Sequence, residues 1–246
     1  MSLITVQDTL PDPSNKYGPA GDSATGPAGP GFSSVQLDSE QKVMSGKTNS
    51  GRLVQNIASG HNWKIKIGYN PMTKAEFNPV FSFLQLRKNS LSPFFVSIPQ
   101  YRHPQNADFK TFISDANNAA GIQTPVVANA GTRYISLVNM PTDSTHSPEP
   151  GDLFTINNSD SLHTKVYQVL RVDTVDSYSL ASAAITSNTT RIIHFHPPLT
   201  RAIEANCVIN FNDPKFRVVA PKDAYGYNLN SDNLYKFSLE LEEAQP

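Results

Sequence analysis

Residues 61–86 have the sequence HNWKIKIGYNPMTKAEFNPVFSFLQL, in which the spacing of the apolar residues changes at Asn70-Pro71. Before this pair, large apolar side chains occupy every second position, which predicts a strand with one buried and one solvated face. After it, apolar residues recur at helical spacing, which predicts a helix. The strand residues are Trp63, Ile65, Ile67 and Tyr69, and the helix residues are Phe77, Val80, Phe81 and Leu84. We expect them to form one core.

The sequence allows two starting points for this helix, which we place near residues 73–86. Thr73 and Glu76 have the spacing of a capping box, in which each residue satisfies a backbone group of the other. Pro79 would then lie inside the helix and remove one backbone hydrogen bond. The alternative is a helix that begins with Asn78 as its cap and Pro79 in its first position. Both starts remain open at this point.

The end of the chain predicts a second two-faced strand. Tyr235, Phe237, Leu239 and Leu241 alternate with polar residues. A strand with one apolar face is a natural partner for the strand at Trp63, because both strands then bury the same side of one antiparallel sheet. The first and last parts of the chain, 32–100 and 216–246, are therefore expected to form one domain. Before Trp63 the pattern predicts only short β-prone pieces, FSSVQL, QKVMSG and GRLVQNIASG.

The middle of the chain, residues 101–215, predicts a separate small β domain inserted into the first. After an irregular polar stretch at 101–120, short apolar strands alternate with turn residues: RYISLVNM, GDLFTI, KVYQVLRV, RIIHF and NCVINF. This spacing is typical of a small antiparallel barrel or sandwich. The fold class predicted for the whole chain is mainly β (α+β).

The first 31 residues are rich in glycine and proline and predict an extended arm. Such a segment has too little apolar surface to offset the entropy of ordering its backbone. We therefore expect the arm to lie along a neighbouring protein, to which it would be anchored by apolar side chains near its start. These anchors are Leu3, Ile4, Val6 and Leu10. The alternative is an arm that folds back on its own subunit.

Composition argues against several classes of partner. The 20 Lys and Arg residues balance 21 Asp and Glu residues, giving a formal net charge of −1, so nothing indicates nucleic-acid binding. Charged residues make up 17% of the chain, less than the usual quarter or so, which suits a surface covered by neighbours.

The single cysteine, Cys207, excludes an internal disulfide and is expected to be buried in a strand. No apolar stretch is long enough to span a bilayer, so we expect no membrane partner and synthesis in a cytosol-like compartment.

No motif carries a convincing catalytic or metal site. SGKT at 45–48 is half of a phosphate-binding loop, but Gln41 stands where that loop needs a glycine. His194 and His196 share a strand face, yet a metal site needs a third ligand that the sequence does not supply nearby. Glu240, Glu242 and Glu243 are explained as the wet face of the last strand. We predict no enzymatic activity, no cofactor and no metal.

Several segments together resemble structural proteins of the tail and baseplate of tailed phages. They are SGRLVQ, NWKIKIGYNPMTKAEFNPVFSFL, PFFVSIP, GDLFTI, HTKVYQVL, FHPPLTRAI and YKFSLELEEA. The resemblance as a whole covers residues 32–243. The resemblance implies a tail-tube-like antiparallel β-sandwich or split barrel with one crossing helix and an inserted small β-barrel domain. The glycine- and proline-rich residues 17–31 depart from the pattern of that family.

The resemblance also implies a role and a set of partners. The protein would be a distal-tail, tube-initiator or baseplate-hub subunit of the virion, made in the host bacterial cytoplasm. It would form a hexameric ring with itself and dock tail tube, sheath, hub or wedge proteins, without sequence-specific nucleic acid. A polar sheet face would line a water-filled lumen or a wet seam between subunits, and four of its charged residues would belong to the interface. The face consists of Lys64, Lys66, Lys236, Ser238, Glu240 and Glu242, and the four are Lys64, Lys66, Glu240 and Glu242.

Two other functions compete with this role. In the first, the inserted β domain is a receptor- or carbohydrate-binding module that uses exposed aromatic side chains. The candidates are Tyr134, Phe154, Tyr167 and Tyr178, which would have to be exposed together. We expect most of them to belong to the core of the inserted domain instead. In the second, the protein hydrolyses cell wall, but no set of residues supports that activity.

Overall fold

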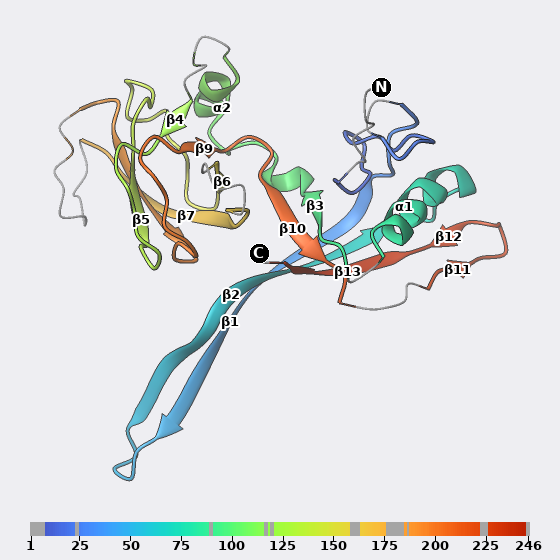
Figure 1. Ribbon diagram of the computed structural model, residues 1–246, viewed down its shortest axis with the longest axis horizontal. Helices are drawn as coiled ribbons and strands as arrows, with labels where there is room; N and C mark the ends of the chain where they lie inside the picture. Colours follow the sequence, from blue (N-terminus) through green and yellow to red (C-terminus); the bar gives the residue numbers. More distant parts are fainter. Residues whose placement is uncertain are drawn as a thin grey trace. The chain divides into compact units, whose positions relative to one another are not determined.

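The computed structural model divides the chain into two compact units (Figure 1). Unit 1 contains Met1–Val96 and Arg217–Ala244, and unit 2 contains Ser97–Phe216 and Gln245–Pro246. Antiparallel strands make up most of the regular structure, which confirms the mainly β prediction. The residues that the structure describes are 8–22, 25–88, 91–115, 118, 121–157, 163–175, 185, 187–221 and 226–244.

Unit 1 is built on one sheet, with strand order β1-β2-β13-β10-β3 in its described residues. The strands are β1 (Phe32–Lys47), β2 (Leu53–Tyr69), β3 (Phe94–Ser97), β10 (Lys215–Val219) and β13 (Ser238–Glu243). Leu241 pairs with Ile65 and Leu239 with Ile67, and all four side chains are buried. The predicted pairing of the first and last parts of the chain is therefore confirmed. The last strand is interrupted, however, because Tyr235–Lys236 (β12) pairs with Asn228–Leu229 (β11) before β13 begins.

The segment before Trp63 differs from its prediction. The structure has no short pieces in this part of the chain, since β1 and β2 form one continuous hairpin that is paired from Phe32–Tyr69 to Lys47–Leu53. Polar residues and glycines do not interrupt the ladder, because each strand needs only the backbone of the other. The ladder tolerates an irregularity between Gln41 and Val43.

Helix α1 (Lys74–Leu86) begins after Thr73, which settles the question of its start. The Glu76 carboxylate accepts hydrogen bonds from the Thr73 backbone N–H at 2.9 Å and from its hydroxyl at 2.8 Å. These bonds lower the pKa of Glu76. Pro79 lies inside the helix.

The buried face of α1 differs from its prediction at one residue. Phe77, Val80 and Leu84 are buried as expected, but Phe81 is half-buried and Phe83 takes the core position. Phe77 stacks on Tyr235 with ring centroids 4.5 Å apart, which packs the helix against β12. The rotation of α1 about its axis decides whether Phe81 or Phe83 faces the core, and spacing alone does not fix it.

Residues 8–10 pair with unit 1 of their own subunit, which is the alternative to the extended arm that we expected. The Leu10 N–H donates to the Phe95 carbonyl at 2.8 Å, and the Phe95 N–H donates to the Asp8 carbonyl at 2.8 Å. Leu10 is 1% exposed, so it is not available to anchor in a neighbour. Residues 8–10 thus extend the sheet at β3. Composition alone did not reveal this backbone pairing. The other predicted anchors, Leu3, Ile4 and Val6, lie outside the described residues.

Unit 2 is a small barrel, as expected for the inserted region. Its strand order is β4-β9-β6-β7-β8-β5 in the described residues. A bridge between Gln123 and Val138 brings the two ends of this order together, so the barrel is nearly closed. The strands are β4 (Ile122–Gln123), β5 (Tyr134–Leu137), β6 (Leu153–Asn157), β7 (Val166–Asp173), β8 (Arg191–His196) and β9 (Val208–Asn210).

Two short helices precede the barrel strands, in a stretch that we expected to be irregular. They are the 3-10 helix η1 (Pro99–Tyr101) and helix α2 (Ala107–Ser114). The Asn106 side chain caps α2 by accepting from the Asp108 and Phe109 N–H groups. Only Phe109 of α2 is buried, so the sequence carries little helical periodicity here. Phe109 joins the barrel core with Phe154, Tyr167, Phe195, Phe211 and Cys207, which is buried as predicted.

Candidate functional site

The first candidate site is the distal part of the β1–β2 hairpin, residues 43–56, which we call the distal hairpin. Strand β13 pairs with β2 only between Lys64 and Gly68. In the described residues, the distal strands therefore pair only with each other. Figure 1 shows the hairpin extending past the other strands of its sheet. A two-stranded hairpin with no core beneath it is marginally stable in water.

The distal hairpin is exposed along its whole length and carries apolar side chains on both faces. Every residue from 43 to 56 is exposed. Val43 and Leu53 lie on one face, at exposed fractions of 52% and 54%, and Met44 and Val54 lie on the other, at 67% and 51%. Between Gln41 and His61 the chain has no acidic residue, whereas Lys47 and Arg52 flank the turn. Exposed apolar side chains gathered in one place mark a surface for association.

The structure places SGKT at the end of this hairpin. Ser45, Gly46 and Lys47 are extended residues of β1. The Thr48 N–H donates to the Arg52 carbonyl at 2.9 Å, and the Gly51 N–H donates to the Thr48 carbonyl at 2.8 Å. These groups close a β-turn and do not form the strand-to-helix loop of a phosphate site.

The four charged residues predicted at the interface lie on the solvated face of the unit 1 sheet. Lys66 pairs in register with Glu240, and Lys64 with Glu242. The Lys64 Nζ atom lies 2.7 Å from Glu40 Oε2 and 3.5 Å from Glu242 Oε1. The hydrogen bond to Glu40 raises the pKa of Lys64. The polar face expected from the alternation is confirmed in β2 and β13, whereas Lys236 lies in β12, outside this sheet. The place of this face at an interface stays a prediction.

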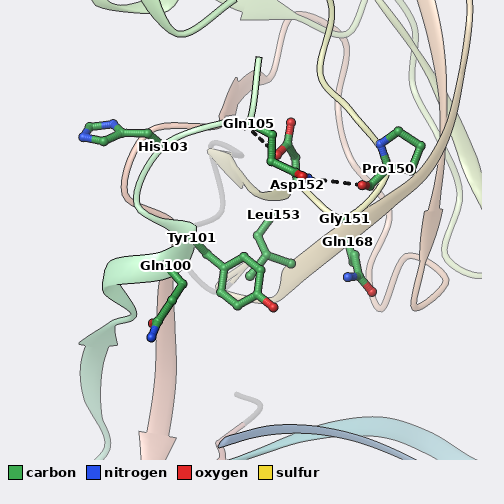
Figure 2. Close-up of a pocket in the computed structure, with 9 residues that line it drawn as sticks. All are labelled: Gln100, Tyr101, His103, Gln105, Pro150, Gly151, Asp152, Leu153 and Gln168. Carbon is green, nitrogen blue, oxygen red and sulfur yellow. Dashed lines mark hydrogen bonds between the residues drawn. The ribbon is translucent and has the colours of Figure 1, made fainter. Parts of the chain in front are cut away.

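The second candidate site is a pocket of about 380 Å³ in unit 2, which we call the barrel pocket (Figure 2). Three segments form it: η1 with the residues that follow it, the turn before β6 with the first residue of that strand, and one residue of β7. The lining residues are Gln100, Tyr101, His103, Gln105, Pro150, Gly151, Asp152, Leu153 and Gln168.

Hydrogen bonds fix the rim of the barrel pocket. The Asp152 carboxylate accepts from the backbone N–H of Gln105 at 3.0 Å and of Glu149 at 2.8 Å. The Gln105 side-chain amide donates to the Pro150 carbonyl at 3.2 Å (Figure 2). The turn needs glycine, because Gly151 has a φ of +105° and a Cβ there would lie 3.1 Å from the Gln105 amide nitrogen. These hydrogen bonds hold the turn before β6 against the segment that follows η1.

The histidines singled out in the sequence take structural positions on the barrel. His194 Nε2 lies 2.9 Å from Asp173 Oδ2, and Arg171 Nε lies 2.6 Å from Asp173 Oδ1, while Asp173 is fully buried. Burial, with the charges of Arg133 and Lys165, lowers the pKa of His196. His194 and Arg171 thus both contact the buried Asp173 carboxylate.

The structure does not support the aromatic surface predicted for carbohydrate binding. Phe154 and Tyr167 are fully buried and stack within the barrel core at a centroid distance of 5.5 Å. Tyr134 is 41% exposed, and Tyr178 lies outside the described residues. Burial of Phe154 and Tyr167 agrees with the expectation that most of these aromatics belong to the core, so the four do not form one exposed aromatic surface.

Within the described ranges, no group of three or more His, Cys, Asp or Glu residues could hold a metal ion. Among the same residues, no helix is long and apolar enough to cross a membrane.

Sequence reasoning missed both candidate sites. The hairpin had a signal, since two β-prone runs flank the turn residues Asn49, Ser50 and Gly51. The barrel pocket had none, because its lining comes from segments far apart in the sequence that only the fold brings together.

The sequence matches no protein-family model, and no curated protein is significantly similar to it. The resemblance to phage tail and baseplate proteins therefore stays a prediction.

Proposed function

We propose that the protein is a non-enzymatic structural subunit of a phage tail or baseplate, of the distal-tail, tube-initiator or hub type. In this role it forms a ring that caps or initiates the tail tube and docks neighbouring tail proteins. The observation that carries the proposal is the distal hairpin, whose two faces both expose apolar side chains.

Apolar side chains on both faces suit insertion of the hairpin between two surfaces of a neighbouring copy. Such a contact joins two different patches, and repeated heterologous contacts close into a ring when the rotation between subunits closes. In the described part of the chain, β1 is an edge strand that pairs with β2, and an edge strand offers backbone groups for pairing with another chain. The low charge of the chain agrees with a subunit that is largely covered by neighbours.

The experiment is sedimentation velocity of the purified chain over a range of micromolar concentrations, with negative-stain microscopy of any assembly. We expect a closed ring. The paired substitution Met44→Ser with Val54→Ser removes the apolar side chains of one hairpin face and should leave a folded monomer. The matched control is Val126→Ser with Val127→Ser, since these valines of unit 2 are 60% and 68% exposed; it should assemble normally.

Two outcomes would contradict the proposal. One is a monomer at every concentration, both for the chain alone and with tail proteins added. The other is equal assembly of the hairpin variant and the parent chain, which would show that the hairpin is not part of the interface.

A further inference from the structure

We propose that the barrel pocket of unit 2 binds a neutral sugar residue. The inference goes beyond ring formation, because the pocket and the distal hairpin belong to different units and either proposal can fail alone. The cavity of about 380 Å³ lies within the size range of small-ligand sites.

Three polar side chains of the lining are available to a ligand. The Gln100 and Gln168 amides and the Tyr101 hydroxyl make no hydrogen bond within the described part of the chain. Amides and hydroxyls both donate and accept hydrogen bonds. Sugar hydroxyls have the same dual capacity, so they are suitable partners for these groups.

The lining offers no free charge, which favours a neutral ligand. Asp152 is 4% exposed, and each of its carboxylate oxygens already accepts a backbone N–H. His103 Nδ1 is 3.0 Å from the Asn212 side-chain oxygen, and Figure 2 shows the imidazole directed away from the other lining residues. A phosphate would find no cation here, and an ammonium ion would find no uncommitted carboxylate.

Apolar surfaces complete the match to a sugar. The Tyr101 ring, the Pro150 ring and the Leu153 side chain all line the pocket, and Figure 2 shows the Tyr101 ring below Leu153. A pyranose has apolar C–H faces and a polar rim of hydroxyls. Ligand sites with this combination of apolar walls and a few placed polar groups are common. The fixed rim, with Gln105 bonded to both Pro150 and Asp152, reduces the entropy cost of binding.

The test is saturation-transfer NMR on the full chain with glucose, galactose, mannose, rhamnose and N-acetylglucosamine as probes. Glucose 6-phosphate and glucosamine serve as charged comparators. We expect at least one neutral sugar to receive saturation and the matching charged sugar to bind more weakly. A disaccharide of the same sugar, tested beside it, distinguishes a site for a single residue from a site for a residue within a glycan chain.

Variants then assign the binding to the pocket. Gln168→Ala and Tyr101→Phe each remove one neutral hydrogen-bonding group, and each should weaken binding about three- to tenfold. Tyr101→Ala also removes the ring and should weaken binding further. Leu170→Ala is the matched control, since Leu170 lies on the same strand as Gln168, is 53% exposed and does not line the pocket; it should bind normally.

The proposal is overturned if no neutral sugar receives saturation, or if the charged comparators bind as well as the neutral sugars. It is also overturned if sugar binding survives Gln168→Ala and Tyr101→Phe unchanged. Should Tyr101→Ala fail to fold, the two milder variants still decide the question.

Discussion

Trp63 is buried between two contacts that fix it in unit 1. Its backbone N–H donates to Glu243 Oε2 at 3.1 Å, and its ring meets the His61 ring edge-on at 4.6 Å. We predict that Trp63→Ala lowers the free energy of unfolding by about 3 to 5 kcal/mol, because it removes a large side chain that the core cannot replace. Urea unfolding followed by circular dichroism measures this, since the substitution removes the only tryptophan.

Lys66→Ala is the control for this prediction. Lys66 lies on the same strand but on the solvated face, so its loss should change stability by less than about 0.5 kcal/mol. Equal urea midpoints for Trp63→Ala and the parent chain would show that Trp63 is not part of a packed core.

Period-two alternation predicted individual core residues of unit 1 where it was strict. Trp63, Ile65 and Ile67 are all buried, because neighbouring side chains of a strand point to opposite faces. The helix was less determined, and Phe83 replaced Phe81 in the core. For the barrel pocket no prediction was available, because Tyr101 and Gln168 belong to elements that meet only after the barrel has formed.

The β1–β2 hairpin shows why sequence patterns underpredict some strands. A strand that is solvated on both faces needs no alternation, so the stretch before His61 gave only short β-prone pieces. The ladder still runs to Lys47–Leu53, because the hydrogen bonds of an antiparallel pair join backbone groups and do not depend on the side chains of the two strands. The sequence thus predicted the buried half of the sheet and missed the distal hairpin, which is the half proposed for assembly.

Residues 8–10 also pair through their backbone, at the opposite edge of the sheet, without a side-chain pattern that predicts the pairing. They close the β3 edge by exchanging two backbone hydrogen bonds with Phe95. We predict that the Leu10 and Phe95 amides are protected from hydrogen exchange in the isolated subunit, before any assembly. Deletion of residues 1–10 should make the Phe95 amide exchange faster, because its acceptor at Asp8 is lost.

Leu10→Ala gives a milder test of the same packing. It keeps the backbone pairing but removes a side chain that is 1% exposed, so it should lower the stability of unit 1 by about 2 to 5 kcal/mol. Fast exchange at Leu10 in the isolated subunit, with protection only in assembled particles, would instead restore the strap-like arm that the composition suggested.

Unit 2 is inserted between two segments of unit 1 along the chain. The chain leaves unit 1 after β3 and returns at β10, and these strands are hydrogen-bonded neighbours in one sheet. Alternating short strands predicted this organisation from the sequence. The exact limits depend on hydrogen bonds such as that from the Ser97 hydroxyl to Asp213, which no pattern reveals.

We predict that residues 97–216 fold when they are expressed alone. The barrel core runs from Phe109 to Phe211, entirely inside this segment. Its two ends are joined by Ser97 and by Arg102, whose Nε lies 3.4 Å from Asp213 Oδ1. Domains of this length normally bury enough apolar surface to be stable.

The fragment should give a dispersed amide NMR spectrum and one cooperative urea transition, matching a transition of the full chain. The complementary chain, with a short glycine-serine linker from β3 to β10, should retain the transition of unit 1. A fragment that stays unfolded while the full chain is folded would mean that the barrel depends on unit 1 for its stability, and that the two units form a single cooperative domain.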